Sequence, residues 1–425
     1  MESDNKYYDV GVVGWWYNSN YGGTLTYYAL HQALKSMGLS VLMIEKSSSD
    51  ADYKPDYSQI PRRFAKKYYD ISDIYHPYKM GALNNICDSF ISGSDQLFSS
   101  ALWKYSGPNY FLDFAHPLKN MISYASSFGE CFNGNPAFHQ KISYYLRRFN
   151  SLSVRENYAV DIMKNNFGLE AVNVLDPVFI CDVTEYDKLI EKSTVKINND
   201  YFCSFILDPN EAKRNAIIYL KEKLHLPYTN LIHATDFEIK MKQLNLDNIK
   251  PDIDIEDFLA YYKNANFIIT DSFHGTCFAI IFRKPFISIA NKTRGVKRFE
   301  SLLKTVGLEN RLVYDCNEIY KKTELFSSID YDKVYEKISE IKNFSYNWLR
   351  NAVLNPPKKT ARDFNVLDAK LYDTIMANYK LMDVVDKQNE EIKLLKLKLA
   401  DNGKSRKENS FISRFLRVLK NKKIQ

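Results

Sequence analysis

One histidine, His274, has the type and the setting of a residue that transfers protons. Residues 267–269 form a short apolar run of strand-forming types, and the polar residues 270–272 follow directly. Gly275 then permits a sharp turn before an apolar segment of helical length. This order puts His274 at the carboxyl end of a strand, the edge where open α/β sheets bind ligands. His274 could act there as a general acid or base, and the alternative is a neutral histidine that hydrogen-bonds the turn.

Cations at two other strand ends could bind an anion. Arg155 follows the apolar strand at residues 151–154, and a guanidinium there can hold a carboxylate or phosphate with two parallel hydrogen bonds. An ion pair with the neighbouring Glu156 is the alternative. Four further cations lie within residues 291–298, directly after another strand. Such a charge run usually forms only a solvated face, but beside a strand-end histidine it predicts a cradle for a multiply charged anion.

Small polar residues and glycines follow the strands of the first half of the chain. A glycine-bearing loop at residues 18–23 separates a strand from a helix at 24–37, and the helix N-terminus can receive an anion. The glycines do not match GxGxxG, so they could equally serve only the turn. Two more strands, near residues 89–93 and 121–125, also end in small polar groups. The predicted substrate-binding residues are Asn20, Gly22, Gly23, Ser94, Asp95, Ser126, Ser272, Arg294, Lys297 and Arg298.

Strands and helices alternate in both halves of the chain, which predicts an α/β fold. We expect two Rossmann-like domains with parallel sheets that face each other across a cleft, at residues 1–182 and 183–350, the second carrying His274. The tyrosine-rich segment 47–80 has no clear period and is expected to be irregular. A C-terminal helical tail completes the fold, as a helical extension at residues 351–402 and a basic amphipathic segment at 403–425.

Charge and cysteine content argue against several function classes. The net charge is +7, but residues 401–425 hold eight Lys/Arg against two Asp/Glu, which leaves +1 for the other 400 residues. A balanced body does not indicate a nucleic-acid-binding surface. The six cysteines form no CxxC or Cys/His cluster, so we predict no metal site and reduced thiols in a cytosolic protein. The sequence also lacks a signal-peptide pattern and an apolar run long enough to span a membrane.

The motifs of the chain, in their order and spacing, resemble those of the polysaccharide pyruvyl transferases between about residues 10 and 313. They are Asn20-Tyr21-Gly22-Gly23, Gly93-Ser94-Asp95-Gln96, Ser153-Val154-Arg155-Glu156, Asp176-Pro177 and Thr270-Asp271-Ser272-Phe273-His274-Gly275. The resemblance implies a GT-B-like pair of Rossmann domains. It also implies an enzyme that transfers the pyruvyl group of phosphoenolpyruvate to a sugar of a bacterial-type surface glycan or its lipid-linked precursor. By resemblance, His274 is the catalytic histidine and Arg155 holds phosphoenolpyruvate.

The reaction implied by this resemblance suits the residue types present. Phosphoenolpyruvate carries a phosphate and a carboxylate, which call for cationic contacts. Forming a ketal requires protonation of the methylene carbon, deprotonation of sugar hydroxyls and expulsion of phosphate, and His274 could be the acid or the base. The scheme needs no cofactor and no metal. The alternatives are a GT-B glycosyltransferase that uses a nucleotide sugar, and a non-enzymatic, membrane-peripheral glycan assembly factor.

Two patterns near the C-terminus predict contacts with partners. Alternating steps of four and three residues predict a short coiled coil, and so a homo-oligomer through residues 381–399, with packing on the protein's own body as the alternative. The residues of this pattern are Leu381, Val385, Gln388, Ile392, Leu395 and Leu399. Residues 411–423 would form a helix with an apolar face flanked by cations, which suits an anionic membrane; a partner-binding or partly disordered tail is the alternative. We therefore expect a cytoplasmic protein, peripheral at the inner face of the cell membrane.

Overall fold

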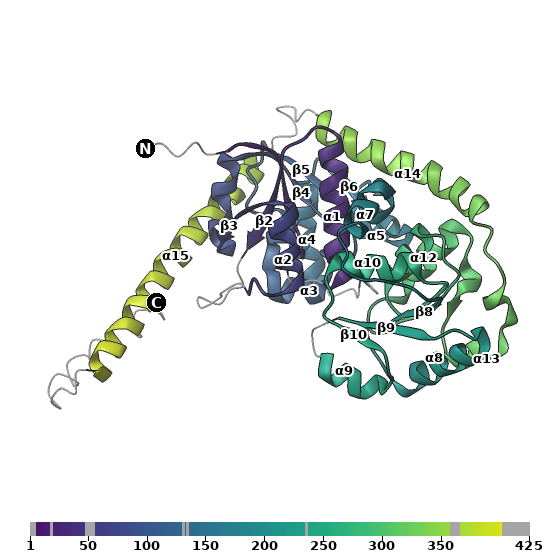
Figure 1. Cartoon of the computed structure of the whole chain (residues 1–425). Helices are drawn as coiled ribbons and strands as arrows, with labels where there is room; N and C mark the ends of the chain where they lie inside the picture. The colour runs from purple at the N-terminus through teal and green to yellow at the C-terminus, as the bar shows by residue number, and fades with distance from the viewer. Residues whose placement is uncertain are drawn as a thin grey trace. The chain divides into compact units, whose positions relative to one another are not determined.

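The computed structural model describes residues 6–17, 20–46, 56–129, 132, 136–233, 237–357 and 366–401. The chain divides into two compact units, residues 1–369 and 370–425. The first unit contains two α/β domains, each built around one parallel sheet (Figure 1). This arrangement confirms the predicted α/β fold of two parallel-sheet domains.

The first domain is organised around seven parallel strands in the order β3-β2-β1-β4-β5-β6-β7. Its strands are β1 (Tyr8–Val13), β2 (Val41–Lys46), β3 (Asp70–Tyr75), β4 (Cys87–Ser92), β5 (Asn120–Ser126), β6 (Ser151–Val154) and β7 (Val172–Asn173). Its helices are α1 (Tyr21–Ser36), α2 (Ile60–Tyr68), α3 (Ser100–Ser106), α4 (Pro136–Arg147) and α5 (Asn157–Phe167), with 3-10 helices η1 (Pro77–Asn85) and η2 (Gly107–Phe111). The strand order reverses between β1 and β4, and such switch points of doubly wound sheets open a crevice for ligands.

The second domain repeats this plan with six parallel strands in the order β10-β9-β8-β11-β12-β13. Its strands are β8 (Phe202–Phe205), β9 (Tyr228–Ile232), β10 (Ile249–Pro251), β11 (Phe267–Thr270), β12 (Phe286–Ile289) and β13 (Leu312–Val313). Its helices are α8 (Glu211–Leu224), α9 (Phe237–Leu244), α10 (Ile255–Asn264), α11 (Phe273–Ile281), α12 (Val296–Val306) and α13 (Asn317–Lys321), with η3 (Glu309–Arg311) and η4 (Thr323–Phe326). Here the order reverses between β8 and β11, directly before His274.

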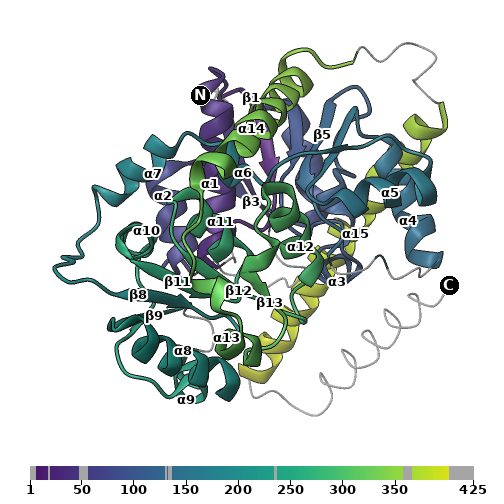
Figure 2. The same cartoon turned by 90° about the vertical axis from the view of Figure 1, so that its right-hand side faces the viewer.

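Two short helices, α6 (Pro177–Ile180) and α7 (Val183–Ile190), lead from the first domain to the second, and a long helix, α14 (Tyr331–Leu354), returns. Val334, near the start of α14, belongs to the core cluster that contains α11, whereas Leu349, near its end, packs in the core of the first sheet. Figure 2 shows α14 running back over the first domain. The expected domain end at residue 350 thus lies inside this helix.

A hydrophobic cluster joins the two domains and fixes how their sheets face one another. Leu25 and Tyr28 of α1, in the first domain, belong to the same buried cluster as Phe258 of α10 and Phe278 of α11. All four side chains are at most 2% exposed. Because this contact lies next to the N-termini of α1 and α11, it positions the residues described below.

The segment expected to be irregular is ordered where the structure describes it. Residues 60–68 form α2 and residues 70–75 form β3, the edge strand of the first sheet, so that prediction was wrong. An edge strand is covered on fewer sides, and β3 has no fully buried residue. Because β3 is rich in polar residues, it does not show the apolar run by which the other strands were predicted.

The described part of the second compact unit, from residue 370 to residue 401, belongs to one long helix, α15 (Val366–Asp401). Several of its apolar side chains are exposed, including Leu381 and Leu395. The helix is compatible with the coiled coil expected at residues 381–399, which stays a prediction. The basic segment expected at residues 403–425 lies outside the described residues. Among the residues that the structure describes, no helix is both long and apolar enough to cross a membrane.

Candidate active site

A cavity of about 270 Å³ lies where the carboxyl ends of the two sheets meet, and both domains line it. From the first domain come residues of the loops after β1 and β4, and from the second come residues after β8, β11 and β12. The lining residues are Asn20, Asp95, Gln96, Leu207, Asp271, Ser272, Phe273, His274, Thr293, Arg294 and Arg298. We call it the interdomain cavity.

Two helix N-termini meet at this cavity. Asn20 caps α1, its side chain accepting a hydrogen bond from the backbone N–H of Gly23 at 3.1 Å. Ser272 caps α11 in the same way, accepting from the N–H of Gly275 at 3.2 Å. Helix N-termini carry partial positive charge and free N–H groups, so this pair favours an anion between them.

The two helices approach so closely that Gly22 has no room for a side chain. A Cβ atom built on Gly22 would lie 2.4 Å from the Cβ and 2.6 Å from the Nδ1 of His274. Glycine at this position therefore serves a close approach across the domain interface.

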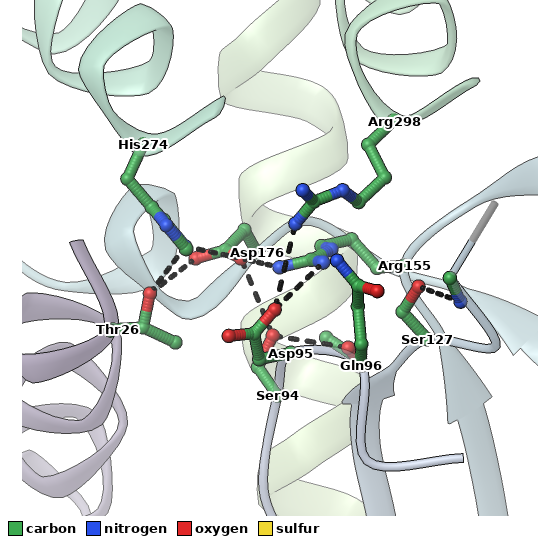
Figure 3. A network of polar contacts seen from close by, with 12 residues as sticks. Thr26, Ser94, Asp95, Gln96, Ser127, Arg155, Asp176, His274 and Arg298 are labelled. Carbon is green, nitrogen blue, oxygen red and sulfur yellow. Dashed lines mark hydrogen bonds and ion pairs between the residues drawn. The ribbon is translucent and has the colours of Figure 1, made fainter. Parts of the chain in front are cut away.

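A buried carboxylate and a hydroxyl of the first domain hold the ring of His274 (Figure 3). Its Nε2 lies 2.7 Å from Thr26 Oγ1 and 3.4 Å from Asp176 Oδ2. Burial by itself raises the pKa of Asp176, but the charges and hydrogen bonds of His274 and Arg155 outweigh it, and the pKa lies well below its usual range. An ionised Asp176 orients the imidazole and stabilises a positive charge on it.

Arg155 is enclosed by three carboxylates and the ring of Phe273 (Figure 3). Its nitrogens lie 2.7 Å from Asp176 Oδ2, 3.1 Å from Glu156 Oε1 and 3.5 Å from Asp95 Oδ1. Its guanidinium carbon is 4.7 Å from the centroid of the Phe273 ring. Burial lowers the pKa of Arg155, but the three carboxylates outweigh it and raise the pKa. The ion pair with Glu156 is thus present, as part of a larger network.

Of the three cations of residues 291–298 that were expected to bind the substrate, two line the interdomain cavity. Arg298 is buried, and its Nη1 lies 3.6 Å from Asp95 Oδ1. Its Nε is buried without a hydrogen-bond partner among the described residues. Arg294 also lines the cavity, but it makes a forked pair with Asp208 at 2.7 and 2.8 Å. Lys297 is exposed, lies 5.3 Å from the Tyr158 ring and does not line the cavity.

A model of the polysaccharide pyruvyl transferase family matches residues 20–293, more than half of the chain. The chain belongs to the polysaccharide pyruvyl transferase family. The matched segment begins at Asn20, the cap of α1, and contains both Arg155 and His274. It ends at Thr293, so Arg298 lies beyond the family match.

Solved structures show that this pyruvyl transferase family member has a GT-B-like fold. A proposed UDP-N-acetylglucosamine 2-epimerase from Listeria monocytogenes is 12% identical, with a TM-score of 0.53 over 85% of this chain and 100% of that one. The S. aureus protein MnaA, solved with UDP, is 13% identical, with a TM-score of 0.52 over 81% and 95% of the two chains. At these identities the likeness extends to the fold alone. The sequence matches no curated protein.

The remaining residues expected to bind the substrate of this family member take different places. Gly22 and Gly23 lie in the first turn of α1, and Gly22 lies against His274. Ser94 is buried, with its Oγ 3.3 Å from Asp176 Oδ2, so it supports the network from behind. Ser126 donates a hydrogen bond to the carbonyl of Gly93 and does not line the interdomain cavity. The structure therefore assigns Ser126 to the sheet.

Two residues of the site escaped the prediction. Asp176 follows β7 and was noted only as part of a motif, although an acid after a strand is a signal of the kind that identified Arg155. Thr26 lies within α1, where one hydroxyl on a helix gives no signal at all. Both contact His274 across the domain interface.

No metal or cofactor was expected. Among the described residues, no group of three or more His, Cys, Asp or Glu side chains is arranged to hold a metal ion. The expectation that the reaction needs neither stays a prediction.

Proposed function

We propose that this protein transfers the pyruvyl group of phosphoenolpyruvate to a sugar of a bacterial-type surface glycan or its lipid-linked precursor, forming a pyruvate ketal and releasing phosphate. The observation that carries the proposal is the shared cavity of His274 and Arg298. His274 there has a buried carboxylate partner, and Arg298 has a buried Nε–H without a hydrogen-bond partner among the described residues. Because the chain belongs to the polysaccharide pyruvyl transferase family, we expect the transferred group to be pyruvyl.

The donor is proposed to bind between the helix N-termini and the two arginines of the cavity. We propose that the Nε–H of Arg298, which has no hydrogen-bond partner among the described residues, donates to the phosphate or the carboxylate. Arg294 and Asp208 are only partly buried, so their ion pair can exchange for one with a trianion. Arg155 does not line this cavity, and its three nitrogens all face carboxylates. We therefore propose that Arg155 supports donor binding by holding Asp95 and Asp176 in place.

His274 is proposed to be the general acid that protonates the methylene carbon. Its Nε2 is held by Thr26 and the ionised Asp176, which fix the orientation of the ring. Its Nδ1 has no hydrogen-bond partner among the described residues, so one ring nitrogen can serve the substrate while the other is held. Of the two roles open to a histidine, general acid and general base, we thus propose the acid role for His274.

The test is an incubation of the purified protein with phosphoenolpyruvate and a panel of lipid-linked sugars, following phosphate release and the mass of the acceptor. We expect release that depends on one acceptor and a product that carries the ketal. The matched arm replaces phosphoenolpyruvate with UDP-sugars. Transfer from a UDP-sugar, with no phosphate release from phosphoenolpyruvate, would instead identify a glycosyltransferase. If the protein neither releases phosphate from phosphoenolpyruvate nor transfers a sugar from a UDP-sugar, with any acceptor of the panel, the result would favour an assembly factor.

Gly22→Ala should reduce phosphate release on the order of 10²-fold, the usual contribution of a proton-transferring group. The added methyl would lie 2.4 Å from the Cβ of His274, so the ring must leave its position against Thr26 and Asp176. Because alanine is the better helix former, α1 should remain folded. Circular dichroism melting checks the fold, and a folded variant with wild-type turnover would mean that His274 need not hold this position.

We also propose that the C-terminal segment 411–423 binds the inner face of the cell membrane, which would bring the enzyme to a lipid-linked acceptor. Each basic residue near an anionic surface contributes roughly 1 kcal/mol, so binding should be reversible and salt-sensitive. Co-sedimentation with anionic and neutral vesicles tests this, with the full chain and a chain that ends at Asn409. Equal sedimentation of both proteins would contradict it. Analytical ultracentrifugation of the two proteins tests the homo-oligomer that is proposed to form through residues 381–399.

A further inference from the structure

Asp95 combines an uncommon backbone conformation with a side chain that reaches the interdomain cavity. It follows β4 with φ +84°, in the left-handed region that non-glycine residues adopt at a cost. Its side chain is 30% exposed and lines the interdomain cavity together with His274. Strain of this kind persists where the surroundings hold a side chain in one place, and it concentrates at functional sites.

The two oxygens of the Asp95 carboxylate have different surroundings. Oδ1 lies 3.5 Å from Arg155 Nη2 and 3.6 Å from Arg298 Nη1, whereas Oδ2 has no hydrogen-bond or ion-pair partner among the described residues (Figure 3). The other acid that lines the cavity, Asp271, is fully buried and accepts from two backbone N–H groups and from Lys213. Asp95 is therefore the acid of this cavity with an oxygen available to a ligand.

Asp95 is ionised in this setting. Burial raises the pKa of Asp95, but the charges of Arg155 and Arg298 outweigh it and hold the pKa below its usual value. An ionised carboxylate accepts hydrogen bonds and does not donate them. Its free oxygen therefore fits a hydroxyl group better than another anion.

We propose that Asp95 is the general base that receives the proton of the first acceptor hydroxyl, across the cavity from His274. The assignment rests on the proposed function. Adding a hydroxyl to phosphoenolpyruvate needs a base at the oxygen and an acid at the methylene carbon in the same step, and one imidazole cannot do both. Asp95 and His274, which both line the cavity, meet this need.

The proton transfers balance over the whole reaction. In the first half, Asp95 takes the hydroxyl proton, the oxygen bonds the central carbon of the donor, and His274 gives its proton to the methylene carbon. In the second half, the bond to phosphate breaks and a second hydroxyl oxygen bonds the same carbon. His274 takes the proton of that hydroxyl, and Asp95 passes its proton to the leaving phosphate. Both residues end in their starting state.

The left-handed backbone of Asp95 permits an informative variant. Glycine adopts φ +84° without strain, so Asp95→Gly should fold with an equal or higher melting temperature. We expect its turnover to fall on the order of 10²-fold, while phosphoenolpyruvate still raises the melting temperature. Formate, a small carboxylate that fits the space of the missing side chain, should restore turnover in a concentration-dependent way.

Matched controls separate a base from a structural role. Formate should not raise the turnover of the wild type or of His274→Gly, whereas imidazole should restore His274→Gly and not Asp95→Gly. Asp95→Asn keeps the shape of the side chain and should lose turnover to the same degree. Wild-type turnover in Asp95→Asn, or a loss in Asp95→Gly that formate does not restore, would overturn the assignment. A wild-type protein that releases no phosphate from phosphoenolpyruvate would instead contradict the proposed function itself.

Discussion

Replacing His274 with alanine should lower turnover on the order of 10²-fold or more while leaving the fold intact. The ring is 6% exposed, and its polar contacts are with Thr26 and Asp176 at the cavity. Because Asp176 keeps its ion pair with Arg155, removing the ring does not leave that carboxylate without a partner. Phosphate release from phosphoenolpyruvate measures the loss.

The His274 variant also distinguishes chemistry from binding. If the histidine acts in proton transfer, kcat should fall while the melting-temperature shift caused by phosphoenolpyruvate changes little. Thr26→Val is a matched variant, because it removes the hydroxyl next to Nε2 and leaves the ring in place; a smaller loss is expected. A His274→Ala protein with near-normal turnover would remove His274 from the mechanism.

Removing the charge of Arg155 should destabilise the protein more than any other single change at the site. Arg155→Leu leaves Asp95, Asp176 and Glu156 without a shared cation in a buried place. Breaking a buried ion pair from one side costs about 3–5 kcal/mol, because the remaining charge is uncompensated. Urea unfolding, followed by the midpoint of the transition, measures the change.

Arg155→Lys should retain part of the stability but weaken donor binding substantially. It keeps the charge, but one ammonium group cannot replace a planar fork that reaches three carboxylates. The matched control is Arg63→Lys, whose ion pair with Asp254 is partly exposed and contributes about 0–1 kcal/mol. If the free energy of unfolding of Arg155→Leu lies within about 1 kcal/mol of the wild-type value, the stability of the network does not depend on the charge of Arg155. Unchanged affinity for phosphoenolpyruvate in Arg155→Lys would show that donor binding does not depend on the support that Arg155 gives to Asp95 and Asp176.

The sequence by itself determined the alternation of strands and helices and the end of each strand that carries the chemistry. Short apolar runs with polar residues after them identified β11 and the turn that contains His274. These features are local, because a parallel strand covered on both faces must be apolar along its whole length. The carboxyl ends of such strands share one edge, so Arg155, Asp95 and His274 could be predicted to lie near a common cleft.

Only the tertiary structure decided which of these residues meet. Gly22 touches His274, and Asp176 holds both the histidine and Arg155, although long stretches of chain separate them. Lys297 lies outside the interdomain cavity although its neighbour Arg298 lines it. On a helix, adjacent side chains point about 100° apart, so a run of cations cannot reveal which of them faces a site. That choice depends on how the two domains close, which is set by the buried cluster of α1, α10 and α11 and by no single motif.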